Sequence, residues 1–227
     1  MTERDQHLDT LQDIRKMMQR SSRFISLSGL SGIAAGIWAL AGAYFAHKWI
    51  AEYYNRVLQA TPFSEINRDS YLPYNDGDAF NRLRLNLVLL AFGVMMMAFL
   101  SAFYFTWRRA ARNKQPLWDH TAKLLTINTM IPVVTGGVFI LAMLQHNEWR
   151  FVAPGCLIFY GLALVSGGRY TLSEIRYLGF TEIVLGMIST QFIGYGLYFW
   201  TVGFGILHLL YGFFMWWKYE RKDLASS

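Results

Sequence analysis

The forty residues from Leu178 to Trp217 constrain the fold of this chain more than any other stretch. They are almost wholly apolar, and only Glu182 and His208 among them have side chains that can be charged near neutral pH. A helix needs about 20 apolar residues to cross the hydrocarbon core of a bilayer. The stretch is therefore predicted to be a hairpin of two membrane-spanning helices, with its turn near Gly194, because glycine accepts backbone angles that other residues avoid.

The composition extends this interpretation to the whole chain. Hydrophobic residues make up 54% of the sequence, and charged residues only 16%, against about 25% in soluble domains. The net charge of +6 does not indicate nucleic-acid binding, because the basic residues cluster at the ends of apolar runs instead of forming one face of a soluble fold.

Six apolar runs predict an all-α fold, a polytopic membrane bundle of six transmembrane helices. The predicted spans are 24–46, 85–107, 124–144, 151–168, 178–193 and 197–217. Together they define a transmembrane domain over 23–218, with one long external loop at 47–84 and a short cytoplasmic tail at 219–227. The first part of that loop is expected to continue the first helix beyond the lipid.

The distribution of Lys and Arg predicts the orientation. Fifteen of the 21 basic residues fall on the side that holds the N-terminus, the C-terminus and the loops after the second and fourth spans. Cytoplasmic loops carry an excess of Lys and Arg. Both termini are therefore expected in the cytoplasm, and the protein in a bacterial inner membrane.

Residues 1–22 have the pattern of an amphipathic cytoplasmic helix. Leu8, Leu11 and Ile14 recur at helical spacing, with charges of both signs between them. The acidic residues in this segment weaken a role in binding anionic lipid, so docking against protein is favoured. The expected partners are membrane lipid and either a second copy of the chain or another membrane protein, with no nucleic acid.

Small residues recur on single helix faces. Small side chains let membrane helices approach closely, which gives van der Waals contacts that lipid cannot match. This pattern predicts a closely packed bundle or an oligomer interface. The residues concerned are Ser28, Gly32 and Gly36 in the first span, Gly179 and Gly186 in the fifth, and Gly205 and Gly212 in the sixth.

Glu182 and His208 form the predicted polar site. Ionisable groups at membrane depth are costly and usually face a bundle interior or a cavity. The two residues differ in depth by about 7–8 Å at 1.5 Å per residue, and Tyr211 lies closer to the level of Glu182. A Glu–Tyr–His chain that passes protons and a Glu–His pair that binds a substrate or cation are both consistent with this spacing. Gln191 and Asn128 complete the candidate set. A polar contact that locks the last hairpin is the alternative to a functional site.

A hydrolase is a more remote hypothesis. Ser31 lies in a GxSG string and His208 in an HxxxG string, as in rhomboid-type intramembrane serine proteases. However, the GxSG string falls in the first span, whereas that family has it in the fourth. An enzyme is therefore not favoured.

No cofactor or metal is expected. The single cysteine, Cys156, leaves no CxxC or CxxCH motif, and His208 is the one histidine at membrane depth, which leaves haem without a pair of ligands.

Three strings resemble a family of uncharacterised six-span bacterial integral membrane proteins with no assigned activity. They are the residues at 22–32, 160–164 and 203–208. The resemblance implies a six-span fold over most of the chain and supplies no site residues.

Two functions remain open. The first is a small transporter or channel with a polar site around Glu182 and His208. The second is a non-catalytic scaffold or sensor subunit that acts through residues 1–22.

Overall fold

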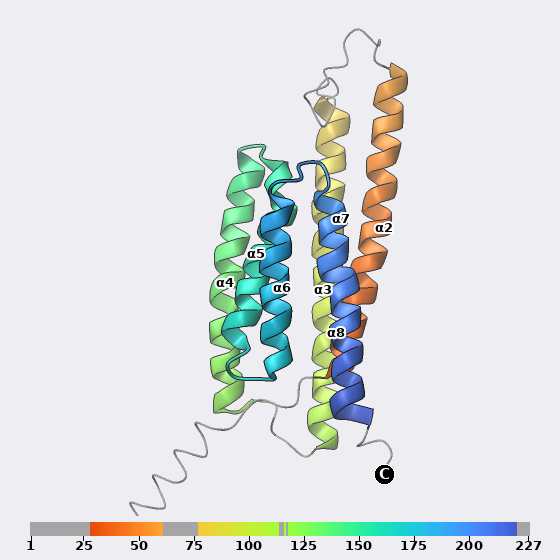
Figure 1. Cartoon of the computed structure of the whole chain (residues 1–227). Coiled ribbons are helices and arrows are strands. Elements are labelled where there is room, and N and C mark those ends of the chain that lie inside the picture. The colour runs from red at the N-terminus through yellow and green to blue at the C-terminus, as the bar shows by residue number, and fades with distance from the viewer. Residues whose placement is uncertain (1–27, 61–76, 114–115, 117, 222–227) are drawn as a thin grey trace, which may run out of the picture.

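The chain folds into long, roughly parallel helices (Figure 1). The computed structural model describes residues 28–60, 77–113, 116 and 118–221, and all regular structure in these ranges is helical. Five of the described helices are long and apolar enough to cross a membrane. The all-α, multi-pass interpretation is thus confirmed at this level. The predicted amphipathic helix at 1–22 lies outside the described residues.

The helices follow one another along the chain with short connections after the first pair. They are α2 (Gly29–Ala60), α3 (Gly77–Arg112), α4 (His120–Gln145), the short η2 (Trp149–Phe151) leading into α5 (Val152–Gly167), and α6 (Ser173–Ser189). The last four helical segments form one continuous span, Gly196–Glu220, which we call the C-terminal helix. The segments are α7 (Gly196–Trp200), η3 (Thr201–Leu207), α8 (His208–Met215) and η4 (Trp216–Glu220). Both η3 and η4 are π-helical.

The turn of the last hairpin lies where the sequence predicts it. The helix α6 ends at Ser189, and the C-terminal helix begins at Gly196. Gly194 in the turn has a φ of 93°, which glycine adopts without steric cost. The helix α6 begins and ends earlier than the apolar run 178–193. Its 17 residues are at the lower limit for a crossing.

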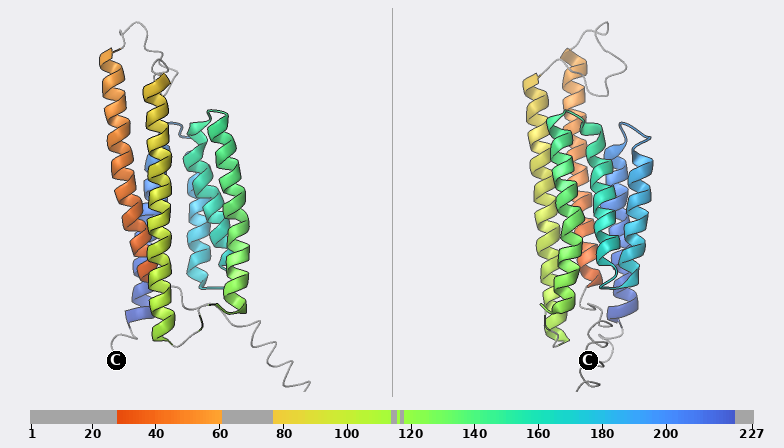
Figure 2. Two further views of the ribbon diagram at one scale, coloured as in Figure 1. Left: turned by 180° about the vertical axis from the view of Figure 1, so that it is seen from behind. Right: turned by 90° about the vertical axis from the view of Figure 1, so that its left-hand side faces the viewer.

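The helices form two groups (Figures 1 and 2). The terminal group consists of α2, α3 and the C-terminal helix, and the middle group consists of α4, α5 and α6. The C-terminal helix meets the middle group mainly through α7, which packs on α5. The two groups therefore share one long interface, along which the C-terminal helix faces α5 and α6.

The helices α2 and α3 extend well past the others at one end of the molecule (Figure 1). With 32 and 36 residues they exceed the length that a bilayer core requires. A small apolar core of Tyr53, Val57 and Leu83 holds the two projecting ends together. The segment after the first apolar run thus continues the helix, as expected.

At the opposite end, the start of α2 is joined to the end of the C-terminal helix. The carboxylate of Glu220 accepts hydrogen bonds from the Ser28 hydroxyl, at 3.1 Å, and from the Gly29 backbone N–H. Arg109 of α3 lies 3.5 Å from the same carboxylate. Glu220 therefore caps the first helix of the described chain and links all three helices of the terminal group.

Glycines bring the backbones of α2 and the C-terminal helix together. A Cβ on Gly212 would fall against the backbone of Gly29, Gly32 and Ile33, and a Cβ on Gly32 would lie 3.1 Å from Gly212 Cα. Farther along, Gly36 faces the carbonyl oxygen of Gly205. We call this contact the glycine seam, defined by Gly29, Gly32, Gly36, Gly205 and Gly212.

In the middle group, α5 and α6 meet in the same way. Gly161 and Gly179 lie against each other's carbonyl oxygens, and Gly186 lies against Ile158. Ser28, the remaining small residue in the predicted set, is buried at the start of α2, where it bonds Glu220.

Candidate functional site

Glu182 is the most deeply buried charged residue among those the structure describes. It lies in the middle of α6, its side chain is 0% exposed, and it faces η3 of the C-terminal helix. Gly203 makes room for it, because a Cβ on that residue would collide with Glu182 Oε2. Neither carboxyl oxygen has a hydrogen-bond partner among the described residues. A buried polar group without a partner is rare and costly, so it requires an explanation.

His208, at the start of α8, lies beside that carboxyl group. Its ring Nδ1 is 3.6 Å from Glu182 Oε1, which is longer than a hydrogen bond. Instead, Nδ1 is 3.0 Å from the carbonyl oxygen of Gly203, and Nε2 is 2.8 Å from the Tyr160 hydroxyl of α5. A carbonyl oxygen can only accept, so the proton is assigned to Nδ1, and in the neutral ring Nε2 accepts from Tyr160.

The Nδ1–H group of His208 thus has two acceptors within reach. It donates to the Gly203 carbonyl of its own helix, while Glu182 Oε1 of α6 lies 0.6 Å farther away, at 3.6 Å against 3.0 Å. An ionised Glu182 would draw the N–H group toward α6, since hydrogen bonds to a charged acceptor are the stronger ones. A protonated Glu182 would leave it with Gly203. The position of one proton can therefore decide whether His208 bonds α6 in addition to Tyr160 of α5.

The surroundings of this cluster are aromatic and its backbone is unusual. Tyr160 and Phe204 pack against the His208 ring, with centroid distances of 5.3 and 5.9 Å. Gly203 and Phe204 belong to the π-helical segment η3, which ends next to His208. Short π-helical segments inside α-helices are frequent at functional sites.

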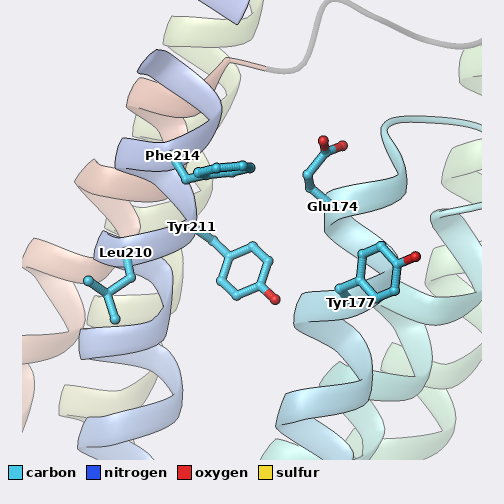
Figure 3. A pocket seen from close by; sticks show the side chains of 5 residues that line it. All are labelled: Glu174, Tyr177, Leu210, Tyr211 and Phe214. Carbon is cyan, nitrogen blue, oxygen red and sulfur yellow. The ribbon is translucent and has the colours of Figure 1, made fainter. Parts of the chain in front are cut away.

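A cleft opens beside the cluster, between α6 and α8 (Figure 3). Its volume is about 480 Å³, and Glu174, Tyr177, Leu210, Tyr211 and Phe214 line it. Tyr211 is three residues from His208, a rise of about 4.5 Å. The inner wall of the cleft is thus one helical turn from the Glu182–His208 cluster.

A second carboxylate lies at the mouth of the cleft. Glu174, in the first turn of α6 ahead of the apolar run, binds the Lys218 ammonium group and accepts a 2.8 Å hydrogen bond from the Tyr219 hydroxyl. An ammonium group and a hydroxyl group thus both bond this carboxylate, which are the partners that an ionised acid needs.

The remaining predicted site residues do not join Glu182. Tyr211 lines the cleft, and the tyrosine that bonds His208 is Tyr160 of α5. Gln191 is exposed in the turn after α6, where it donates to Thr190, because the helix ends before it. Asn128 bonds the Leu124 carbonyl of its own helix and the Tyr170 hydroxyl. Gln191 and Glu182 therefore lie apart, although they belong to the same apolar run of the sequence.

The Ser31–His208 dyad is not formed. The Ser31 hydroxyl donates to the carbonyl oxygen of Ser28, and both ring nitrogens of His208 are bonded to Tyr160 and Gly203. The short bond that keeps Ser31 in the first turn of α2 leaves the histidine without a serine to activate.

Sequence reasoning missed Tyr160 and the role of Gly203. Tyr160 lies in a run where aromatic residues are common, so its hydroxyl carries no sequence signal. Gly203 is not among the small residues that the sequence analysis identifies in the last span. A glycine on the helix that faces an intramembrane acid is the signal that could have identified it.

These features define the class as a multi-pass helical membrane protein with a buried Glu–His pair. Comparisons with protein-family models, with curated proteins and with solved structures give no match to this chain. The resemblance to a six-span family is therefore not supported by a family match. Among the described residues, five helices are long and apolar enough to cross a membrane.

Proposed function

We propose that this protein is a proton-coupled transporter with six membrane spans, in which Glu182 is the proton-binding residue. The observation that carries the proposal is the fully buried Glu182 carboxyl, which has no hydrogen-bond partner among the described residues and lies between two groups of helices. An acid held this way is costly as a permanent ion in the membrane, whereas it can take up and release a proton.

The alternative role, a structural lock, fits this geometry less well. A lock would require a direct hydrogen bond between Glu182 and His208, because that bond offsets the cost of burying both groups. The 3.6 Å separation and the Gly203 acceptor leave this bond unmade. The N–H group of His208 is instead free to change acceptors when Glu182 changes its protonation state.

The position of the site also favours transport. Substrate and ion sites of many transporters lie between two helix groups that move against each other. Here the groups are bonded at three levels. Lys218 bonds Glu174 at one end, His208 meets Tyr160 and Glu182 in the middle, and Arg84 of α3 bonds Asn147 and the Leu144 carbonyl at the other.

The sixth crossing and the orientation are part of the proposal. The hydrogen bond between Ser28 and Glu220 brings the start of α2 and the end of the C-terminal helix to one end of the bundle, which requires an even number of crossings. The helix α6 would supply the sixth. With the excess of Lys and Arg on that end, it would face the cytoplasm, and the cleft beside Glu174 would open inward. The expected homo-oligomer and the scaffold role of residues 1–22 stay predictions.

The experiment is a proton-movement assay in liposomes. Purified protein is reconstituted with a trapped pH-sensitive dye, a pH gradient is imposed, and organic cations, organic anions and neutral solutes are added in turn. We expect one class to dissipate the gradient, and Glu182→Gln to slow this by at least about tenfold, or about 1.4 kcal/mol in the barrier.

The matched control is Glu148→Gln, because Glu148 is an exposed carboxylate paired with Arg150 outside the apolar core. It should transport like the wild type. The proposal fails if no class of solute moves protons, or if Glu182→Gln behaves like Glu148→Gln at equal folded amounts.

A further inference from the structure

The cleft between α6 and α8 has the lining of a binding site for a cation. Three of its five lining residues are aromatic, namely Tyr177, Tyr211 and Phe214, and one is the carboxylate Glu174. In Figure 3 the rings of Phe214 and Tyr211 reach from α8 into the space toward α6. Aromatic faces carry negative potential and attract cations, most strongly where water is displaced. The volume of about 480 Å³ is in the range of small-molecule sites.

A cation of the chain itself already contacts two of the residues that line this cleft. The Lys218 ammonium group binds Glu174 and lies 5.7 Å from the ring centroid of Phe214 and 5.1 Å from that of Tyr219. Both distances are within the range of cation–π attraction, about 6 Å. The contacts of Lys218 thus show the chemistry that these side chains accept, a positive charge between aromatic rings and a carboxylate.

Lys218 can leave this position for water. Its side chain is 49% exposed and is attached through a flexible stem, whereas the Glu174 side chain is only 9% exposed. Once released, the Lys218 ammonium group is hydrated and does not become an unpaired buried charge. Glu174, in contrast, needs a positive partner wherever Lys218 goes, because a nearly buried carboxylate without one is unfavourable.

The cleft is also open on the side of the bundle. Tyr177 is 62% exposed, and Leu210 and Phe214 are 60% and 51% exposed. On a helix inside a membrane, such residues border the lipid. A ligand with apolar substituents can therefore reach the cleft from within the bilayer and place its charge near Glu174.

We propose that this cleft binds a lipophilic organic cation, such as a quaternary ammonium or phosphonium ion with apolar substituents, and that Lys218 is a tethered competitor for the same place. The inference names the substrate class of the proposed transporter, and so it rests on that proposed function. Entry of the cation displaces the Lys218 ammonium group from Glu174 and thereby breaks the bond between the helix groups at this end.

The test measures equilibrium binding of radiolabelled tetraphenylphosphonium to the full chain in detergent. We expect saturable binding by the wild type, binding about fivefold tighter in Lys218→Met, and binding at least about tenfold weaker in Glu174→Gln. Methionine keeps the apolar stem of lysine and removes only the competing charge. A purely structural role for the Lys218–Glu174 pair predicts that both variants bind more weakly.

Arg221→Met is the matched control. Arg221 is a cation at the same end of the C-terminal helix, but it lies over Trp217, at 4.1 Å from the ring, and outside the cleft. The Arg221→Met variant loses one positive charge, as Lys218→Met does. A general electrostatic effect would therefore strengthen cation binding equally in both variants. We expect a change within about twofold, because a solvent-screened charge that does not contact the lining residues acts weakly on the cleft.

Tetraphenylborate, an anion of the same shape, tests the ligand class. The proposal is overturned if the anion binds as tightly as the phosphonium ion, if Lys218→Met binds more weakly than the wild type, or if phosphatidylethanolamine alone displaces the probe from every variant. The two proposals can fail separately. Saturable phosphonium binding without proton movement would reject the transporter and keep the cation site, whereas proton movement driven only by another solute class would do the reverse.

Discussion

The C-terminal helix has two faces that are built in opposite ways. Toward α2 it presents the glycine seam, where Gly212 and Gly205 bring backbone against backbone. Toward α6 it presents Tyr211 and Phe214, which border a cleft of about 480 Å³. Closely packed backbones cannot slide without clashing, whereas side chains around a cleft can rearrange. From this comparison we expect the terminal group to stay rigid and any motion to take place at its interface with the middle group.

The largest effect is expected from a methyl group in the glycine seam. A Cβ at Gly212 would lie 2.8 Å from the Gly29 carbonyl oxygen and 2.9 Å from the Gly32 carbonyl carbon, both of them backbone atoms that cannot turn away. We expect Gly212→Ala to lower the free energy of unfolding by the upper part of the range of about 1–3 kcal/mol that overpacking costs. Thermal unfolding in detergent, followed by tryptophan fluorescence, measures it.

The control for this variant is Gly93→Ala in α3. A Cβ there has nothing within 4 Å, and alanine is the better helix former by about 1 kcal/mol. Its unfolding temperature should stay equal or rise. If Gly212→Ala unfolds at the same temperature as Gly93→Ala, the seam is not the rigid face that we describe.

A smaller loss of stability, but a selective loss of activity, is expected at Gly203. A Cβ on Gly203 would meet the ends of the Leu157 and Glu182 side chains, which can shift, so we expect Gly203→Ala to fold with a loss of about 1 kcal/mol. It should nevertheless abolish solute-driven proton movement, because the Glu182 carboxyl must leave its place. The liposome assay and detergent unfolding give the two readouts.

Gly205→Ala provides the comparison. Gly205 contributes its carbonyl oxygen to the glycine seam, but a Cβ on it would meet the Leu40 side chain of α2, with Cδ2 at 2.5 Å, and no backbone atom closer than 3.9 Å. We expect Gly205→Ala to lose about as much unfolding free energy as Gly203→Ala and to retain solute-driven proton movement. Equal activity of the two alanine variants would mean that the position of the Glu182 carboxyl does not matter for function.

The smallest effect is expected at Tyr160. Tyr160→Phe keeps the ring contacts and removes the hydroxyl group that bonds His208 Nε2 at 2.8 Å. The loss of one hydrogen bond corresponds to about 0.5–1.5 kcal/mol in the free energy of unfolding. Because Tyr160 donates to the neutral ring, the variant should also shift the pH dependence of proton movement. Tyr44→Phe, at an exposed position on α2, should change neither quantity. An unchanged pH profile in Tyr160→Phe would remove the tyrosine from the proposed mechanism.

The helices could be predicted from the sequence, because apolar runs of this length have few other stable forms. The turn at Gly194 and the continuation of the first helix past its apolar run also followed from local residues. The end of α6 did not, since Thr190 and Gln191 are no stronger helix breakers than the residues before them. That difference of a few residues placed Gln191 outside the helix.

The site could be predicted only in part. Glu182 and His208 were identifiable because charge is rare at membrane depth. Their neighbours were not, because a helix that is apolar all round has no periodic pattern to show which face is buried. Tyr160 and the aromatic lining of the cleft look in sequence like residues that face lipid. The contact between Glu182 and His208 also depends on how α6 and α8 lie side by side, which no single-span pattern contains.

The bond between Ser28 and Glu220 bears on how the molecule is made. It joins residues 192 positions apart, and the glycine seam beside it likewise pairs the first helix of the described chain with the last. During synthesis the glycine face of α2 has no partner until the C-terminal helix has been inserted. Contacts this distant in sequence form late. A closely packed contact of the finished bundle is thus one that forms only after the last helix has been inserted.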